Sequence, residues 1–226
     1  MMSTALRKLD EFRLWPYRAM GRRRMERIVL EHVGHRSFVI LPHVFNPNIF
    51  RSARCLAEHI AQCRLPPPNG NPTALDMGTG SGIQAVVLAG RGFAVTAVDI
   101  NPQAVRCAEI NATLNGLEDR IEVLESDLFA QVAGRTFDLV VFNPPFFKGE
   151  AKSDFELAWK SIDVVDRFAA DVSHALKPHG KTLIVWSSYA EEQALLGPLL
   201  RANLRTQAVS RRRMGAEKLT VYEAQR

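Results

Sequence analysis

The chain of 226 residues lacks an apolar run long enough to span a bilayer, and its first residues lack the apolar core of a signal peptide. Asp10 and Glu11 are also atypical of an organelle transit peptide. Its three cysteines are scattered without CxxC spacing, and its six histidines show no HExxH-like spacing. These absences predict free thiols in the cytoplasm, no membrane segment and no metal site.

The positive charge is concentrated in the opening segment. Residues 1–27 contain eight lysines and arginines against three acids, whereas the rest of the chain contains 21 residues of each sign. A second local excess is Arg211-Arg212-Arg213. Such segments are typical either of a solubilising surface or of a contact with an acidic partner such as RNA or a ribonucleoprotein. Eight basic residues do not by themselves define a binding groove, so both readings stay open.

The stretch LPPPNGNP at residues 65–72 indicates a boundary, because clustered proline and glycine continue neither a helix nor a central strand. We therefore expect two parts. Residues 1–68 form a basic N-terminal extension with a helical segment, SARCLAEHIAQC, that covers a ligand site. Residues 69–226 form the main domain, in which strand and helix patterns alternate.

This alternation predicts an α/β fold with a Rossmann-like, mostly parallel sheet covered on both faces. The last two strands are joined by only a few residues, too few for a parallel crossover, so they predict an antiparallel hairpin. Seven strands are expected at residues 73–77, 93–99, 120–126, 137–143, 181–187, 204–210 and 218–224. Helices are expected at residues 52–63, 82–90, 102–116, about 162–176, and 191–202.

The turn after the first of these strands, LDMGTGSG, contains Gly78, Gly80 and Gly82. Glycines let a backbone approach a ligand closely and point helix N–H groups toward it. Asp99 ends the second strand 21 residues after Gly78, where an acid can hold ribose hydroxyls. Asp127 ends the third strand, where an adenine edge would be met. The three strand ends predict one nucleotide-binding cleft.

A dinucleotide is the competing ligand, but dinucleotide folds usually show G-x-G-x-x-G, and the spacing here is G-x-G-x-G. Asp76 precedes the turn, where an anion would oppose a pyrophosphate. It would suit a cationic ligand end, such as the ammonium group of S-adenosylmethionine. Asp76 can equally accept hydrogen bonds from backbone N–H groups of the turn, and the two roles are compatible.

The segments LDMGTGSG, TAVDIN, ESDLF and DLVVFNPPF together resemble class I S-adenosylmethionine-dependent methyltransferases, from about Val44 to the C-terminus. The resemblance implies S-adenosylmethionine as the cofactor. It implies cofactor contacts by Asp76, Gly78, Thr79, Gly80, Gly82, Asp99, Ile100, Asp127, Leu128 and Asn143.

The Asn-Pro-Pro-Phe signature narrows the resemblance to enzymes that methylate a planar, conjugated nitrogen. Within this group, VFNPNIFRSARCLAEHI and SRRRMGAEKLTVYEA resemble the release-factor glutamine N5-methyltransferases. That branch usually has Tyr where this chain has Phe146, and acidic residues where this chain has NPNIFRS. The resemblance implies a glutamine-like side chain of a polypeptide as substrate. An RNA or DNA amino group, adenine N6 or guanine N2, is the alternative, and a non-catalytic scaffold is a third.

The prolines that end the strand DLVVF have a chemical rationale. The lone pair of an amide or exocyclic amino nitrogen is delocalised, so the nitrogen is a poor nucleophile. The Asn143 side-chain oxygen and the Pro144 carbonyl can each accept a hydrogen bond from one N–H group of this nitrogen. These hydrogen bonds can turn the lone pair toward the methyl donor. Phe146 can stack on the flat target group. Asn143, Pro144 and Phe146 are therefore the predicted catalytic residues, and the alternative role of this stretch is a rigid turn.

Overall fold

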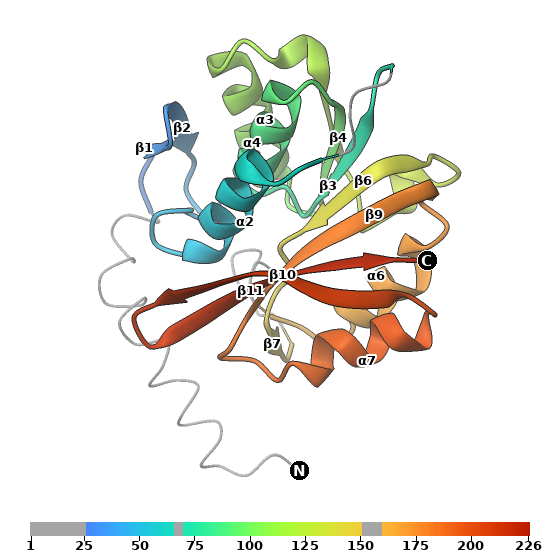
Figure 1. Ribbon diagram of the computed structural model, residues 1–226. Helices are drawn as coiled ribbons and strands as arrows, with labels where there is room; N and C mark the ends of the chain where they lie inside the picture. Colours follow the sequence, from blue (N-terminus) through green and yellow to red (C-terminus); the bar gives the residue numbers. More distant parts are fainter. Residues whose placement is uncertain (1–25, 66–69, 151–159) are drawn as a thin grey trace.

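The computed structural model describes residues 26–65, 70–150 and 160–226. Its centre is a seven-stranded sheet with the order β10-β11-β9-β6-β3-β4-β5 (Figure 1). β11 pairs antiparallel with β9 and β10, and the remaining neighbours are parallel. This confirms the predicted sheet and its closing hairpin. The strands are β3 (Thr73–Met77), β4 (Ala94–Asp99), β5 (Ile121–Glu125), β6 (Phe137–Phe142), β9 (Leu176–Ser187), β10 (Arg205–Met214) and β11 (Glu217–Gln225).

Helices cover both faces of the sheet, because its central strands are apolar on both sides. One face packs against α2 (Arg51–Gln62), α3 (Ile83–Gly90) and α4 (Pro102–Leu114). The other packs against α6 (Val164–Val172) and α7 (Gln193–Arg201) (Figure 1). Along β6, Leu139 and Val141 belong to the first core, and Val140 and Phe142 to the second. Short 3₁₀ turns, η1 (Glu118–Arg120) and η2 (Ala130–Val132), flank β5.

The local sequence explains where α4 begins and ends. The Asn101 side chain accepts a hydrogen bond from the backbone N–H of Gln103, and Pro102 occupies the first turn, where no intrahelical donor is needed. Gly116 follows the last turn with φ +64°, the left-handed conformation that commonly closes a helix. α4 thus carries Asn101 at the same sheet edge as Asp99, which ends β4.

A hairpin near the start of the described residues was absent from the sequence prediction. It consists of β1 (Val29–Val33) and β2 (Arg36–Ile40). The fully buried Asn111 of α4 accepts from the Val39 N–H at 2.7 Å and donates to the Val39 carbonyl at 2.7 Å. The hairpin therefore shares a core with the main sheet. The expected boundary between residues 68 and 69 lies outside the described residues and stays a prediction.

Two element boundaries differ from the sequence prediction. The predicted helix through residue 176 ends at Val172, and β9 already begins at Leu176, opposite Phe137. The pairing of β9 with β6 shifts register beyond Phe137, and this irregular stretch accommodates Pro178. The three arginines at 211–213 lie within β10 rather than in the connection after it.

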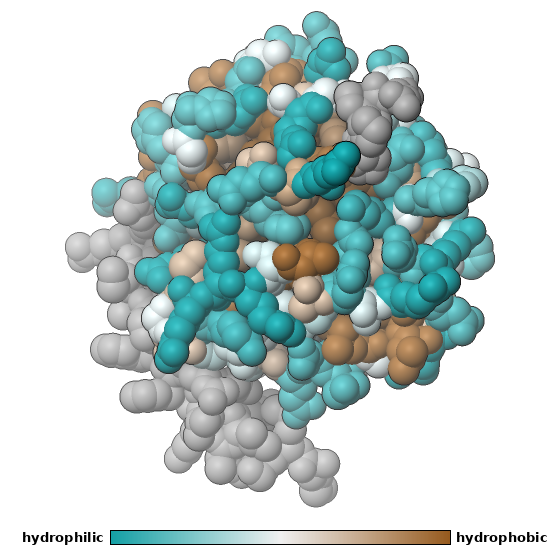
Figure 2. All heavy atoms as spheres, in the orientation of Figure 1, coloured by the Kyte–Doolittle hydropathy of each residue, from teal (hydrophilic) through white to brown (hydrophobic). Residues whose placement is uncertain are grey.

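Two further observations concern the outside of the molecule. β7 (Phe147–Lys148) and β8 (Lys160–Ser161) form a separate short parallel pair. Hydrophilic side chains cover most of the face in Figure 2, and apolar ones gather over the region of α7, where Leu200 is 74% exposed. Within the described ranges, no helix is long and apolar enough to cross a membrane.

Candidate active site

A cleft of about 200 Å³ opens at the carboxyl ends of β3, β4, β5 and β6. Most predicted cofactor residues line it: Gly78, Thr79, Gly80, Asp99, Ile100, Asp127, Leu128 and Asn143. Asp76 and Gly82 are not among the lining residues, and neither are the predicted catalytic residues Pro144 and Phe146. Sequence reasoning missed other lining residues, chiefly His43, Phe45, Ser126, Lys160, Ser161 and Arg167.

The glycine turn after β3 adopts the backbone that its sequence predicts. Gly78, Gly80 and Gly82 have φ values of +63°, +55° and +76°. A Cβ atom at Gly82 would lie 3.0 Å from the Ala108 Cα, so this glycine lets α3 pack closely on α4. At Gly80, by contrast, the nearest atom would be the Phe45 Cβ at 4.0 Å. Gly78 and Gly80 border the cleft, and Gly82 serves helix packing.

Asp76 holds the turn from inside the protein. Its Oδ2 atom accepts hydrogen bonds from the Thr79 hydroxyl at 2.6 Å and from the Ala85 N–H at 3.0 Å. Burial raises the pKa of Asp76 to about 7, although both hydrogen bonds oppose the shift. These contacts correspond to the role in which Asp76 accepts hydrogen bonds from the turn. The predicted contact of Asp76 with the cofactor ammonium stays a prediction.

Asp99 ends β4 beside the turn. Its Oδ2 accepts from the Gly80 N–H at 2.8 Å, and its Oδ1 accepts from the Asn101 N–H at 2.9 Å. The low-polarity surroundings raise the pKa of the Asp99 carboxyl, and these backbone hydrogen bonds oppose that effect. Each carboxylate oxygen can accept a second hydrogen bond, so Asp99 keeps capacity for two hydroxyl donors from the cleft.

Asp127 lies at the mouth of the cleft and is exposed. It forms an ion pair of 2.7 Å with Arg167 of α6, and the pair raises the pKa of the Arg167 guanidinium. The next residue, Leu128, has φ +49°, a conformation uncommon for a residue with a side chain. The β5 end is therefore tied to α6 across the cleft.

The Asn143–Phe146 turn presents an unpaired acceptor. Asn143 lines the cleft at the end of β6, and its buried Oδ1 atom receives no hydrogen bond from any residue that the structure describes. Pro144 is buried, and Pro145 lines the cleft. The Phe146 ring contacts Trp186 of β9 edge-on, with centroids 5.5 Å apart and an interplanar angle of 75°. Trp186 thus supports the aromatic ring of this turn.

The segment before α2 closes the cleft on the side of the glycine turn. Phe45 stacks on Phe50 at 4.1 Å, and His43 and Phe45 line the cleft. Asn46 and Asn48 each donate a side-chain hydrogen bond to the buried Glu31 of β1, at 2.8 and 2.6 Å. This segment is anchored on the N-terminal hairpin that the sequence prediction lacked.

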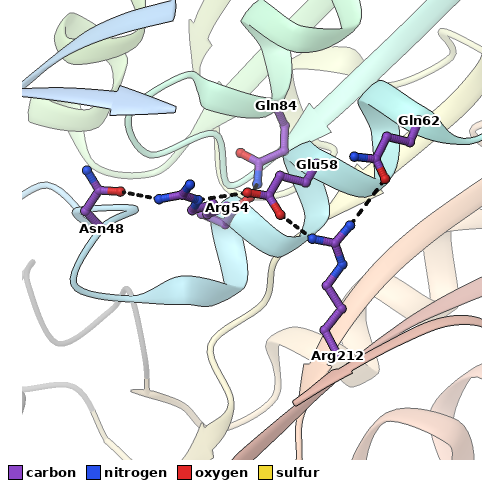
Figure 3. A network of polar contacts seen from close by, with 7 residues as sticks. Asn48, Arg54, Glu58, Gln62, Gln84 and Arg212 are labelled. Atoms are coloured by element: carbon purple, nitrogen blue, oxygen red, sulfur yellow. Dashed lines mark hydrogen bonds and ion pairs between the residues drawn. The ribbon is translucent and has the colours of Figure 1, made fainter. Parts of the chain in front are cut away.

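A polar network continues from this segment along α2 to the C-terminal hairpin (Figure 3). Arg54 donates to Asn48 at 3.4 Å and forms an ion pair of 2.8 Å with Glu58. Arg212 of β10 contacts the other Glu58 oxygen and donates to Gln62 at 3.4 Å. Residues from both ends of the described chain therefore position the helix that borders the cleft.

The geometry fits a ligand that brings hydrogen-bond donors into the cleft. A backbone turn with positive φ angles, a carboxylate with spare acceptor capacity and a buried unpaired amide oxygen converge on one cleft. The described residues contain no group of three or more His, Cys, Asp or Glu side chains that could hold a metal ion. The arrangement suits group transfer guided by hydrogen bonds.

Comparisons with known proteins agree with this geometry. Solved structures of methyltransferases share this fold. Residues 36–215 match the family model described as the methyltransferase small domain. The chain belongs to this family and is an S-adenosylmethionine-dependent methyltransferase.

Three similar proteins illustrate the range of the family. A Methanocaldococcus jannaschii protein named as a protein N5-glutamine methyltransferase is 32% identical, over 69% of this chain and 82% of its own. The release factor glutamine methyltransferase of Shewanella oneidensis is 37% identical, over 83% of this chain and 68% of its own. The structure of a T. thermophilus 16S rRNA guanosine-N2 methyltransferase with AdoMet and guanosine has a TM-score of 0.66 at 23% identity. The match covers 88% of this chain and half of that one.

Proposed function

We propose that the protein methylates the side-chain amide nitrogen of a glutamine-like residue in a polypeptide. The observation that carries the proposal is the buried, unpaired Oδ1 atom of Asn143, a residue that lines the cleft. A buried acceptor without a donor costs about 1–3 kcal/mol, so a donor from a bound molecule is the natural partner. A primary amide supplies such donors on its nitrogen.

The cofactor would be held by the turn around Gly78 and Gly80, by Asp99 and by the backbone near Leu128. When bound, S-adenosylmethionine supplies an electrophilic methyl carbon on a sulfonium. Asn143 Oδ1 and the Pro144 carbonyl would accept hydrogen bonds from the two N–H groups of the target nitrogen. They would thereby keep its lone pair directed at the methyl carbon. The new N–C bond forms as the C–S bond breaks, and the nitrogen releases one proton to solvent. The residues contribute alignment, which supplies most of the rate in such transfers.

Phe146 would flank the planar target group. Its ring is half-buried and fixed at one side by Trp186, which is 3% exposed in the rigid strand β9. A ring held in this way offers its remaining surface in one orientation. This role for Phe146 rests on the position of the turn, because Phe146 is not among the lining residues of the cleft.

A nucleobase amino group is the second candidate acceptor. It is supported by the fold match to the rRNA enzyme and by the excess positive charge in residues 1–27. The glutamine reading is better supported. The two relatives described above that are named for glutamine methylation match over more than two thirds of their own lengths, whereas the rRNA enzyme matches over half of its length.

The test is transfer of radiolabelled methyl groups into cell lysate by the purified protein, with Asn143→Ala as the inactive control. The expected result is label that protease releases and nuclease leaves in place, and that yields N-methylglutamine after proteolytic digestion. Label released by nuclease would overturn the glutamine proposal in favour of the nucleobase candidate.

A further inference from the structure

The β10–β11 hairpin extends beyond the sheet at the edge where the cleft opens. β9 ends at Ser187, opposite Leu219 of β11, but the pairing of β10 with β11 continues to Met214 and Glu217. Because β6 and β9 are parallel, the end of β9 lies at the same edge as Asn143, which follows β6. The projecting part of the hairpin therefore stands beside the active site.

Alternation along the strands divides the hairpin cations between two faces. Arg212 points toward α2, where it contacts Glu58 (Figure 3). Arg211 and Arg213 lie on the opposite face, and Lys218 shares it because it pairs directly with Arg213. We call Arg211, Arg213 and Lys218 the basic face.

The basic face is exposed to solvent. Its three side chains belong to exposed residues, and no ion pair joins any of them to an acid in the described parts of the chain. Figure 2 shows hydrophilic side chains gathered over the region of this hairpin. Arg213 and Lys218 lie on the projecting part of the hairpin and Arg211 lies at its base, and together these cations attract an acidic group.

The basic face is connected to the acceptor turn through cross-strand neighbours. Arg211 pairs with Thr220, Thr220 pairs with Trp186, and Trp186 contacts Phe146. Directly opposed residues share a face of the sheet. Two strand spacings separate Arg211 from Trp186 by roughly 10 Å. Adding the 5.5 Å between the Trp186 and Phe146 rings places Arg211, the member of the basic face nearest the active site, roughly 15 Å from the acceptor turn.

We propose that the basic face docks acidic side chains of the polypeptide substrate, four to five residues from the methylated one. This proposal rests on the proposed glutamine methylation. An extended chain spans about 3.3 Å per residue, so roughly 15 Å corresponds to four or five residues. Arginine recognises carboxylates through paired N–H donors, which adds orientation to the attraction.

A polypeptide fits this surface better than a nucleic acid does. β10 is the edge strand of the sheet, and an extended peptide can hydrogen-bond to such an edge. Polynucleotide binding commonly draws on many phosphate contacts. The chain from residue 28 onward carries equal numbers of basic and acidic residues, so this body lacks the excess charge of a polyanion site.

The experiment measures kcat/KM for synthetic glutamine peptides at low ionic strength. Each peptide carries two Glu, two Lys or two Ala residues at four and five positions from the target, on its N-terminal or its C-terminal side. The variants are R211E/R213E, the single variant K218E, and R205E as matched control. Arg205 is an exposed arginine on the same strand, roughly 20 Å from Arg211 along β10, in the direction away from the cleft. Calorimetric affinity for S-adenosylmethionine checks that every variant is folded.

The wild type should favour the Glu peptide over the Lys peptide by about five- to tenfold on one side of the target, the effect of two or three exposed ion pairs. R211E/R213E should reverse this preference, K218E should reduce it, and R205E should keep it. Peptides methylated without charge preference, or an equal effect of R205E, would overturn the docking proposal while glutamine methylation stands. Methylation of nucleic acid and of no peptide would overturn both proposals.

Discussion

Replacement of Asn143 tests the chemistry of the site most directly. If Asn143 Oδ1 accepts a hydrogen bond from the target nitrogen, Asn143→Ala removes an interaction that strengthens as the nitrogen rehybridises. Loss of one preorganised group of this kind lowers the rate by about a hundred- to a thousandfold. The expected change is in single-turnover methyl transfer, with most cofactor affinity retained.

The unpaired state of this oxygen gives a second, independent expectation. Within the described residues, Asn143 Oδ1 has no donor to lose, so its removal breaks no internal hydrogen bond at that atom. Removing a buried unsatisfied acceptor relieves about 1–3 kcal/mol, so Asn143→Ala should leave the free energy of unfolding unchanged or raise it. Slow transfer together with undiminished stability would identify a group kept for function.

Asn143→Asp separates the possible roles of this side chain. A carboxylate keeps the acceptor and nearly the same shape, so appreciable activity should remain if the oxygen is the working atom. If the amide N–H₂ group anchors the substrate instead, Asp should be as damaging as Ala. Wild-type transfer rates in Asn143→Ala would refute the reasoning and reduce the Asn-Pro-Pro-Phe stretch to a rigid turn.

Three other changes test the cleft and its support. Asp99→Ala should weaken the binding of S-adenosylmethionine by about ten- to a hundredfold, as measured by calorimetry, because hydrogen bonds to a charged group contribute about 1.5–3 kcal/mol. Unchanged affinity would show that Asp99 is not part of the cofactor site. Gly82→Ala should lower the thermal midpoint more than Gly116→Ala. Both positions have positive φ, but only at Gly82 would the new Cβ meet Ala108, at 3.0 Å, and equal losses would show that backbone strain alone matters. Burial raises the pKa of Asp76 to about 7, so the folded state binds more protons than the unfolded state below that pH. The stability of the wild type should therefore fall relative to Asp76→Asn as pH rises toward about 7 and level off above it in denaturant titrations, and a constant difference between pH 5 and 8 would contradict this.

The edge of the sheet at which the cleft opens could be predicted from the sequence because its signals are local. Each strand–helix unit places a strand end at the same edge of a parallel sheet, so Gly78, Asp99 and Asp127 were expected together from chain order alone. The same rule placed Asn143 beside them.

Contacts between residues far apart in the sequence could not be predicted in this way. Arg167 pairs with Asp127 across 40 positions of the chain, and nothing in the sequence around either residue names the other. The docking of the β1–β2 hairpin on Asn111 depends in the same way on a contact over 72 positions. The strand expected at residues 181–187 begins earlier, at Leu176, because an irregular register beside Phe137 admits Pro178.

The order of strands at the C-terminal side of the sheet has a consequence for how the chain acquires its structure. β11 lies between β9 and β10, so β10 has no place in the sheet until β11 has been added. During synthesis β9 remains an open edge, the kind of surface that invites wrong pairing, while β10 waits unpaired. A chain that stops before Glu217 thus loses two strands instead of one. It also loses the attachment of Arg212 to α2, so the last strand made completes both the sheet and the wall of the cleft.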